Sequence, residues 1–167
     1  MIVRRIQKSD LENFFILWTG VFNERIYLEN PPPPKERIEP VLNKVEILKI
    51  PQFVALEEGE LIGSIEAFPG TMCGHDTDTI GYLGAQVRKD YRGKGVGRVL
   101  LETVIEDSKR FGYRELRLSV FNSNGPARKL YENAGFKYGD GNGYASSSES
   151  EGDSKLKMYL VLEKSLA

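Results

Sequence analysis

Apolar side chains recur at helical spacing through the first fifty residues. Side chains three or four positions apart share one face of an α-helix, so this spacing predicts two helices. Ser9, with Glu12 three positions later, predicts a capping box at the start of the first helix. The prolines at 31–34 cannot continue a helix and predict an extended connector, and the second helix is expected to stop before Pro51. The predicted core stripes are Leu11, Phe14, Phe15, Trp18, Val21 and Phe22, then Ile38, Val41, Leu42, Val45 and Leu48.

Past the second helix the pattern changes to that of β-strands. The segments "QFVALEE" and "LIGSIEAF" flank a predicted turn at Glu58 and Gly59, and "TIGYLGAQV" follows a polar loop. This arrangement predicts an antiparallel meander of three strands. Gly81 and Gly84 lie inside the third of these strands, where glycine indicates either a β-bulge or a backbone that another group approaches closely.

The second half of the chain alternates between strands and helices. The segment "RKDYRGKGVGR", residues 88–98, joins a strand to an amphipathic helix that is predicted to end at Gly112. "ELRLSVF" then predicts a strand, "SNGPARKLYENAGF" a short helix with Gly135 at its end, and "KLKMYLVLEKSL" a last strand. The Gly/Ser/acid segment at 142–154 is too polar to pack and predicts a flexible loop. A βαβα unit is therefore expected to follow the meander.

Composition limits the classes of protein to consider. The 167 residues fit one domain spanning 1–167, and a formal net charge of −1 argues against bulk electrostatic binding to nucleic acid. The chain has no apolar run of the roughly eighteen residues that a membrane span needs, and its start lacks a signal peptide, so we expect a cytoplasmic protein with no membrane partner. Cys73 is the only cysteine, which excludes an internal disulfide and a cysteine-based metal cluster. His75 is expected to be a solvated loop residue rather than a metal ligand.

Positive charge is concentrated in the loop at 88–98, which holds five basic side chains and one acid. Gly93, Gly95 and Gly97 alternate within it, and a helix follows. Neither a Walker loop nor a Rossmann turn fits, because Arg98 stands where the third Rossmann glycine would fall. Glycines nevertheless allow backbone N–H groups to close on an oxyanion, and the positive end of the helix dipole attracts it. The loop therefore predicts a phosphate-bearing ligand; the alternative is a surface turn with solvated basic side chains.

"VRKDYRGKGVG", followed further along by "NGPARKLYENAGF", resembles the GNAT superfamily of N-acetyltransferases. The resemblance covers residues 80–136, and the order of elements agrees over the whole chain. It implies an α/β fold with a mixed, mostly antiparallel central sheet, helices on both faces, and fourth and fifth strands that splay apart. It also implies acetyl-CoA, which would enter between those strands, and an amine acceptor as partners, with no metal. A monomer and a homodimer both remain open.

The resemblance assigns the contacts of the coenzyme to individual residues. It places the pyrophosphate on backbone amides between Arg92 and Arg98 and pairs the pantetheine arm with the strand end near Val87. Asn124 corresponds to a polar contact with that arm. The implied coenzyme-binding residues are Val87, Arg92, Gly93, Lys94, Gly95, Val96, Gly97, Arg98 and Asn124.

The implied reaction moves an acetyl group from acetyl-CoA to a primary amine by direct attack in a ternary complex. An alkyl ammonium of pKa ~10.4 must first lose a proton, which requires a base. Some family members have a glutamate early in the fourth strand, where this chain has Gly81, so Glu66 on the preceding strand is the substitute base; a solvent-facing strand residue is the alternative. Tyr131 corresponds to the tyrosine beside the thioester sulfur and is the predicted proton donor to the leaving thiolate, with packing beside Phe136 as the alternative.

Two questions stay open at this point. The acceptor is either a small amine or a protein or peptide, acetylated at its N-terminus or at a lysine. Glu24 and Glu29 are predicted to line the acceptor side, or else to be ordinary solvated loop acids. A sensor module that binds acyl-CoA without turnover would keep the glycine loop but would not need Tyr131, so the presence of this tyrosine favours an enzyme.

Overall fold

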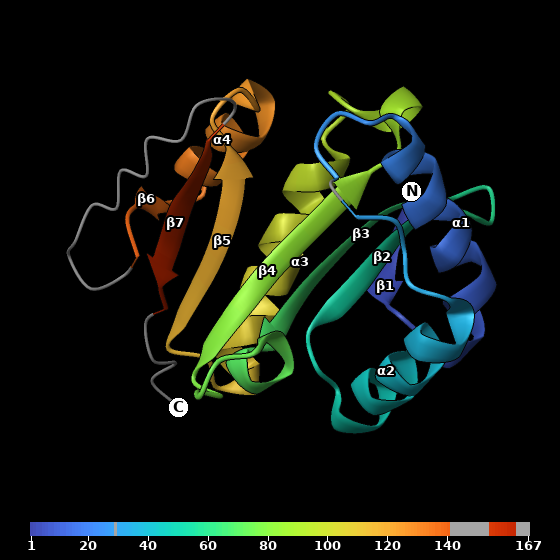
Figure 1. Ribbon diagram of the computed structural model, residues 1–167, viewed down its shortest axis with the longest axis horizontal. Helices are drawn as coiled ribbons and strands as arrows, with labels where there is room; N and C mark the ends of the chain where they lie inside the picture. Colours follow the sequence, from blue (N-terminus) through green and yellow to red (C-terminus); the bar gives the residue numbers. More distant parts are fainter. Residues whose placement is uncertain (29, 141–153, 163–167) are drawn as a thin grey trace. The chain divides into compact units, whose positions relative to one another are not determined.

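The computed structural model describes residues 1–28, 30–140 and 154–162 of the 167. The flexible loop predicted at 142–154 falls, apart from its last residue, outside these ranges. The helices are α1 (Leu11–Asn23), α2 (Lys35–Leu48), α3 (Val96–Phe111) and α4 (Gly125–Asn133), with short 3₁₀ turns η1 (Lys8–Asp10), η2 (Gly70–Cys73) and η3 (Lys89–Tyr91). The strands are β1 (Ile2–Arg5), β2 (Gln52–Glu57), β3 (Glu60–Pro69), β4 (Ile80–Val87), β5 (Glu115–Phe121), β6 (Lys137–Tyr138) and β7 (Lys155–Val161) (Figure 1).

The described strands are hydrogen-bonded in the order β1-β2-β3-β4-β5-β7-β6. The pairs β1 with β2, β2 with β3, β5 with β7 and β6 with β7 are antiparallel, whereas β4 and β5 are parallel. The parallel ladder runs only from Ile80 with Glu115 to Tyr82 with Arg117, although both strands continue past it. The mixed, mostly antiparallel sheet and the short pairing of its fourth and fifth strands confirm the predicted fold.

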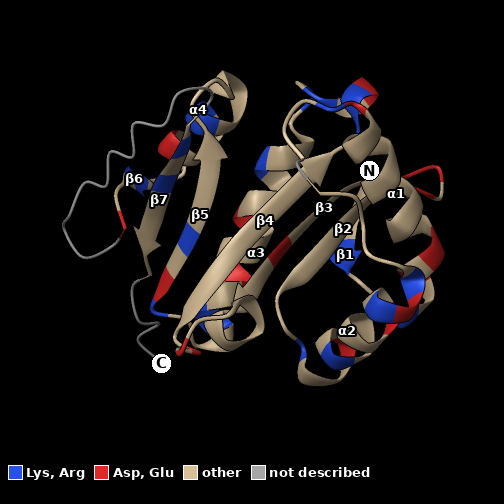
Figure 2. Cartoon of the chain, in the orientation of Figure 1, with Lys and Arg blue, Asp and Glu red and all other residues tan. Residues whose placement is uncertain are grey.

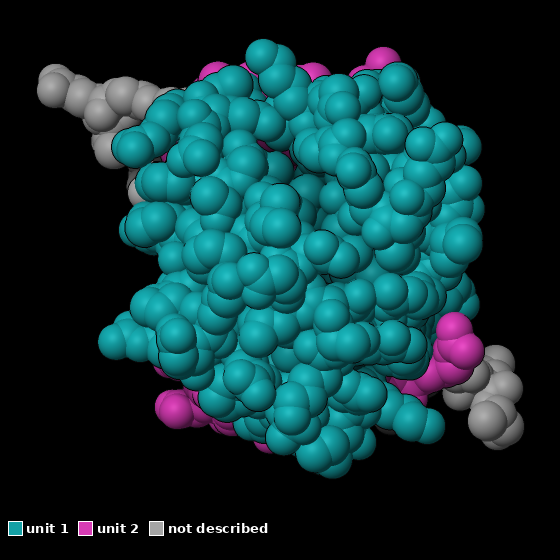
Figure 3. Space-filling view, turned by 90° about the vertical axis from the view of Figure 1, so that its right-hand side faces the viewer, with its two compact units in different colours: residues 1–67, 84–107 teal, residues 68–83, 108–167 magenta. Residues whose placement is uncertain are grey.

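The chain divides into two compact units, each made from separate segments of the sequence. Unit 1 comprises residues 1–67 and 84–107, and unit 2 comprises residues 68–83 and 108–167 (Figure 3, teal and magenta). β4 and α3 each contribute residues to both units.

In unit 1 the strands lie between helices, with α1 and α2 on one face and α3 on the other (Figure 1). Gly63 allows α3 to approach β3 closely, because a Cβ there would lie 3.1 Å from Leu100 Cδ1 and 3.3 Å from Val96 Cγ1. The turn between β2 and β3 falls where predicted, at Glu58 (φ +50°) and Gly59 (φ +81°). The core of unit 1 includes Phe14, Leu17, Ile38, Leu42, Val45, Val54, Ile62, Ile65, Leu100, Leu101 and Val104.

Two local predictions in unit 1 are wrong. Ser9 does not cap α1; instead the Asp10 carboxylate accepts the Gln7 N–H at 2.7 Å and closes a capping box around η1. Leu48 is 54% exposed although it continues the apolar stripe of α2, because the helix ends there and the chain turns away. The buried face of α1 includes Leu17, which the predicted stripe omitted.

Unit 2 is built on the antiparallel ladder between β5 and β7, with β6 pairing on the far side of β7. Gly112 (φ +106°) and Gly135 (φ +99°) follow the ends of α3 and α4, which confirms both predicted helix ends. The core of unit 2 includes Tyr113, Leu116, Leu118, Val120, Tyr131, Phe136 and Met158. Across both units, none of the helices that the structure describes has the length and apolar character of a membrane span.

Candidate active site

The loop between β4 and α3 turns through two left-handed residues. Gly93 has φ +74° and Gly95 has φ +87°, values that residues with a side chain rarely adopt. No heavy atom of the described residues lies within 4 Å of a Cβ built at either glycine. Glycine is therefore needed here for the backbone conformation, and the space beside the loop is available to a ligand.

α3 begins at the end of this loop and directs its first N–H groups toward it. Its first helical hydrogen bond runs from the Val99 N–H to the Gly95 carbonyl, at 3.2 Å. The N–H groups of Val96, Gly97 and Arg98 precede that bond, so the helix offers them no carbonyl. Val96 itself is 4% exposed and packs at Gly63, which fixes the start of the helix against β3. Unpaired N–H groups at the positive end of a helix dipole are the features of an anion-binding site.

Arg92 holds the loop to two other parts of unit 1. Its Nε donates to the Val87 carbonyl at the end of β4, at 2.8 Å, and its Nη2 lies 2.7 Å from Glu24 Oε2 just after α1. Arg92, which the resemblance implied as a coenzyme-binding residue, therefore also stabilises the position of the loop. Glu24, predicted on the acceptor side, is occupied by this ion pair, and Glu29 lies outside the described residues.

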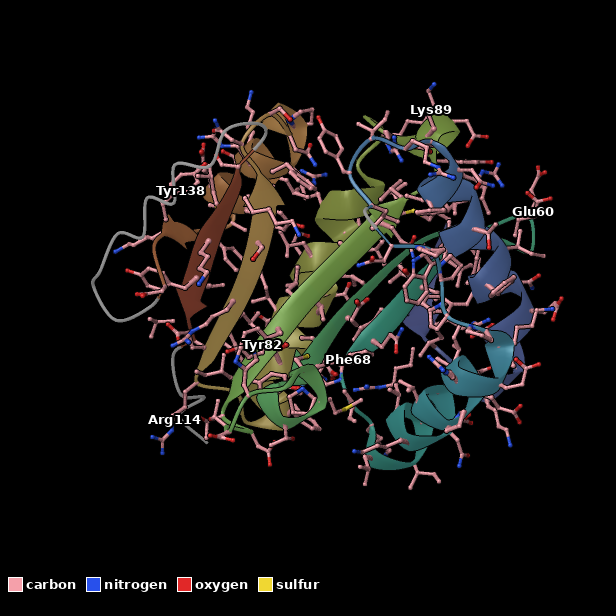
Figure 4. The ribbon with its side chains drawn as sticks, in the orientation of Figure 1. Glu60, Phe68, Tyr82, Lys89, Arg114 and Tyr138 are labelled. Atoms are coloured by element: carbon pink, nitrogen blue, oxygen red, sulfur yellow. The ribbon has the colours of Figure 1, made fainter. Side chains whose placement is uncertain are left out.

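The other basic side chains of the loop differ in their partners. Arg88 pairs with Asp90 at 2.7 Å and with Glu60 at 2.9 Å, and hydrogen bonds to these carboxylates raise its pKa above the usual range. Lys94 and Arg98 are exposed; the Lys94 ammonium lies over the Tyr91 ring and helps to lower the pKa of Asp90, and Arg98 has no carboxylate partner among the described residues. Lys89, on the turn after β4, points away from the ribbon (Figure 4). The charge available to a ligand beside the glycines therefore comes mainly from Lys94 and Arg98.

The end of β4 has a backbone edge that no described strand covers. On the β3 side, the Arg88 N–H donates to the Ile62 carbonyl at 2.8 Å. Because successive peptide groups of a strand alternate between its two edges, Val87 directs its N–H to the opposite edge. The ladder with β5 has already ended at Tyr82, so among the described residues no strand covers that edge at Val87.

Glu66 lies on β3 with its carboxyl group above Gly84 of β4. A Cβ at Gly84 would overlap Glu66 Oε1 and would lie 3.1 Å from its Cδ. Only glycine therefore leaves room for the carboxyl group in this position. This contact confirms the close approach that the sequence predicted at Gly84.

The Glu66 carboxyl group is half-buried and has no hydrogen-bonding or ionic partner among the described residues. Burial raises its pKa from 4.5 to about 8, because the charged form loses its hydration. A carboxyl group with this pKa is mostly protonated at pH 7 and becomes a base as the pH rises. These surroundings differ from those of a solvent-facing strand residue.

Gly81 shows why a carboxylate is absent early in β4. A Cβ at Gly81 would lie 2.7 Å from Tyr113 Cδ2 and 2.8 Å from Leu116 Cδ2. Both distances are shorter than real carbon contacts, and both neighbours belong to the core of unit 2. A side chain here would collide with these core residues, so Gly81 leaves no room for the glutamate that the resemblance implied early in the fourth strand of some family members.

In unit 2, α4 carries the two remaining predicted site residues. Asn124 is the N-cap of α4, and its Oδ1 accepts the Ala127 N–H at 3.3 Å. This leaves the donors of its Nδ2 for another partner. Tyr131 is 8% exposed, and its ring packs edge to face on Phe136 with 5.6 Å between centroids. The packing contact is present, and the role of the Tyr131 hydroxyl in catalysis stays a prediction.

The predicted site residues thus fall into two groups. Glu66, Val87 and residues 92–98 belong to unit 1, whereas Asn124 and Tyr131 belong to unit 2. The sequence interpretation passed over three further polar residues on the strands of unit 1. These residues are Gln52, Ser64 and Gln86. Each is a polar residue within an apolar strand segment, and this pattern could have identified them.

Comparison with known proteins identifies the family. The model of the acetyltransferase (GNAT) family matches residues 22–136. The chain therefore belongs to this family, and it is an enzyme of the acyltransferase class.

Relatives of known sequence and structure agree with this assignment. YwnH of Bacillus subtilis (strain 168), provisionally named a phosphinothricin acetyltransferase, is 28% identical over 141 residues, which cover 81% of this chain and 83% of YwnH. The [ribosomal protein bS18]-alanine N-acetyltransferase of Escherichia coli (strain K12) is 38% identical over 74 residues, 44% of this chain and 49% of that protein. The phosphinothricin acetyltransferase of Sinorhizobium meliloti, solved in complex with acetyl-CoA, has a TM-score of 0.77 at 19% identity, covering 99% of this chain and 90% of that one. The similarity to the S. meliloti structure, at 19% identity, is evidence for the fold alone.

Proposed function

We propose that this protein transfers the acetyl group of acetyl-CoA to a primary amine by direct attack in a ternary complex. The observation that carries the proposal is the left-handed glycine loop at Gly93 and Gly95, which leads directly into the unpaired N–H groups of α3. A diphosphate is the anion that such a loop suits. The family assignment and the acetyl-CoA bound to the S. meliloti relative support this coenzyme.

In this proposal the backbone of unit 1 holds the coenzyme. The N–H groups of Val96, Gly97 and Arg98 donate to the diphosphate oxygens. The positive side chains of Lys94 and Arg98 offset the negative charge of the diphosphate. Arg92 keeps the loop in position through its hydrogen bond to the Val87 carbonyl. The uncovered backbone edge at Val87 binds the amide groups of the pantetheine arm, and the Asn124 Nδ2 contacts the same arm.

The proposed chemistry uses Glu66 as the base. As a carboxylate it takes a proton from the acceptor ammonium, directly or through water, and the freed nitrogen attacks the thioester carbonyl carbon. Backbone N–H groups of β4 stabilise the oxyanion that forms. The carbon–sulfur bond then breaks, the nitrogen loses its second proton as the amide forms, and the Tyr131 hydroxyl protonates the departing thiolate. One proton is released to solvent for each acetyl group transferred.

The names of the relatives indicate two classes of acceptor. The YwnH match spans most of both chains, and that name refers to a small molecule. The E. coli match spans less than half of this chain, and that name refers to an alanine of a ribosomal protein. A small primary amine is therefore the first candidate acceptor, and a protein amine is the second.

Titration with acetyl-CoA tests the coenzyme site. Gly95→Val should weaken binding by at least about 10-fold, because a side chain at a left-handed position strains the loop by roughly 1–2 kcal/mol and also blocks the approach of the diphosphate. Gly20→Ala is the control, since Gly20 likewise has no atom near its Cβ position but lies within α1. Wild-type affinity in the Gly95 variant would show that the loop does not hold the coenzyme.

Release of free thiol from acetyl-CoA with a panel of primary amines tests turnover. A sensor module would bind acetyl-CoA and release no thiol with any amine, which would contradict an enzyme acting on amines. Tyr131→Phe keeps the ring that packs on Phe136 and removes only the hydroxyl group. Under the proposal, turnover should fall by about 10²-fold with acetyl-CoA affinity unchanged, the usual size of a general acid effect. Unchanged turnover, with the chemical step limiting the rate, would remove Tyr131 from the mechanism.

A further inference from the structure

Four polar side chains lie together on one face of the strands of unit 1, and we refer to them as the polar row: Gln52, Ser64, Glu66 and Gln86. Gln52 of β2 is directly paired with Glu66 of β3, and paired residues project to the same face of a sheet. Ser64 lies two positions before Glu66 on the same strand, so it shares that face. Gly84 faces the Glu66 carboxyl group, and Gln86 follows Gly84 by two positions on β4, which places Gln86 on this face too.

Three members of the polar row carry buried polar atoms without a hydrogen-bond partner among the described residues. These atoms are Gln52 Oε1, Ser64 Oγ and Gln86 Oε1. A buried polar atom without a partner costs about 1–3 kcal/mol, so proteins rarely keep several in one place unless another molecule pairs with them. The fourth member, Glu66, has no partner among the described residues either. The polar row is therefore incomplete as a network within the protein.

The chemistry of the polar row indicates what would complete it. As the two amides are oriented here, two amide oxygens, a hydroxyl oxygen and a carboxyl group present hydrogen-bond acceptors that have no donor among the described residues. β2, β3 and β4 contain no Lys or Arg to supply the missing donors, and Glu66 is the one ionisable member of the polar row (Figure 2). An ammonium group has three N–H donors and a positive charge, which match these acceptors.

The burial of the polar row means that it can bind the terminal group of a ligand but not a group in the middle of one. Gln52 is 2% exposed and Ser64 is fully buried, whereas Glu66 and Gln86 are partly exposed. A group that reaches Ser64 must therefore pass Glu66 or Gln86 and must be small. A terminal ammonium meets this requirement, and a bulky or substituted amine does not.

We infer that the polar row is the binding site for the acceptor amine, with Ser64 and Gln86 as specificity-determining residues that hold the ammonium beside Glu66. This inference rests on the proposed function and adds the groups that select the acceptor. It predicts that the enzyme acts on primary alkyl amines, which are cations at pH 7. Neutral aryl amines and secondary amines have fewer N–H donors and should be poor acceptors.

The chain offers a matched pair of variants to test this inference. Ser64 and Ser108 are both fully buried serines whose Oγ atoms have no partner among the described residues, but Ser108 lies on α3 outside the polar row. Ser64→Ala and Ser108→Ala remove the same group from equally buried positions. Any effect of Ser64→Ala on the amine that Ser108→Ala lacks therefore reports on the polar row.

The measurement is steady-state kinetics with the best amine of the panel at saturating acetyl-CoA, together with the acetyl-CoA dissociation constant. The KM for the amine should rise about 10- to 100-fold in both Ser64→Ala and Gln86→Leu, the usual loss for a hydrogen bond to a charged group. Ser108→Ala should leave this KM unchanged, and all three variants should bind acetyl-CoA as the wild type does. If Gln86→Leu does not fold, the comparison of Ser64→Ala with Ser108→Ala still tests the inference.

The outcomes separate this inference from the proposed function. Equal KM values for the amine in Ser64→Ala, Ser108→Ala and the wild type would overturn the inference and leave the coenzyme site intact; buried water would then be the partner of the polar row. Turnover of aniline as fast as that of benzylamine would overturn it as well. Loss of acetyl-CoA binding by the wild type, or the absence of turnover with every amine, would instead contradict the proposed function and this inference with it.

Discussion

Asp10 and Glu66 are two carboxyl groups of unit 1 that are withdrawn from solvent, yet their pKa values move in opposite directions. Burial by itself raises the pKa of both. At Asp10 two hydrogen bonds from Arg4, at 2.8 and 2.9 Å, and one from the Gln7 N–H outweigh burial and lower the pKa. At Glu66 no such partner exists among the described residues, so burial alone acts and the pKa rises to about 8.

Unit 1 thus contains one carboxyl group with partners in the protein and one without a partner among the described residues. The Asp10 carboxylate joins β1 to the start of α1, and its charge is neutralised within the protein. The Glu66 carboxyl group contacts an open glycine backbone and retains its capacity to exchange a proton. An unpaired, desolvated carboxyl group is destabilising where it stands, and such groups gather at functional sites. Five experiments test whether the two carboxyl groups differ in this way.

The largest effect is expected from Glu66→Gln. The amide keeps the shape of the side chain but cannot accept the proton of the ammonium, so turnover should fall by about 10²- to 10⁴-fold. Acetyl-CoA affinity should stay the same in a calorimetric titration. Glu60→Gln, at the other end of β3, is the control and should retain most activity. Wild-type turnover in Glu66→Gln would place the base elsewhere.

Asp10→Asn should cause the second largest effect, on stability rather than on rate. Removing the buried partner of this part-buried ion pair leaves Arg4 without its carboxylate and should lower the free energy of unfolding by about 1–3 kcal/mol. Urea denaturation at pH 7 measures the change. In the double variant Arg4→Leu/Asp10→Leu the loss should be smaller than the sum of the two single losses, because no unpaired charge remains. Strictly additive losses would show that the two groups are not coupled.

The pH dependence of the free energy of unfolding is expected to give the third largest effect, and it should distinguish Asp10 from Glu66. The lowered pKa of Asp10 contributes stability that is present above its unfolded value of 3.8 and is lost as the pH falls. The raised pKa of Glu66 acts the other way: folding is favoured below its unfolded value of 4.5, and this contribution declines as the pH rises toward about 8. Urea denaturation across this range should therefore show a loss of stability with rising pH that Glu66→Gln removes.

Activity should follow the same ionisation of Glu66 in the opposite sense. In the proposed mechanism the carboxylate is the active form, so kcat/KM at saturating acetyl-CoA should rise with pH and level off above about pH 8. A profile that levels off near the ordinary glutamate pKa of about 4.3 would show that Glu66 is solvated in the working enzyme.

The smallest effect is expected from Gly84→Ala. The new Cβ would overlap Glu66 Oε1, which is the far end of a flexible side chain, so the fold should lose no more than about 1 kcal/mol while the carboxyl group shifts. Turnover should fall about 3- to 10-fold, as expected when a base is displaced from its working position. Gly20→Ala, where nothing lies near the new atom, should leave turnover unchanged. Equal turnover in the two variants would mean that the contact with Gly84 does not position Glu66.

Several features of this protein were determined by the sequence itself, because they depend on neighbouring residues. The hairpin turn at Glu58 and Gly59 and the helix ends at Gly112 and Gly135 fall where glycine and short-range periodicity placed them. Gly93 and Gly95 have a left-handed backbone, which is a local property of the glycine loop singled out from the sequence. Backbone conformation at such positions is a local property, since only glycine adopts it without strain.

Other features were decided by the tertiary structure alone. The capping box at Ser9 and Glu12 was a valid local pattern, but Asp10 took its place because Arg4 and the Gln7 N–H both bind the Asp10 carboxylate. The sequence could propose Glu66 as a base, but not that Gly84 would lie beneath its carboxyl group or that Gln52 would pair beside it. A pKa depends on which groups surround a carboxyl group in space, and strand register brings those groups from distant parts of the chain.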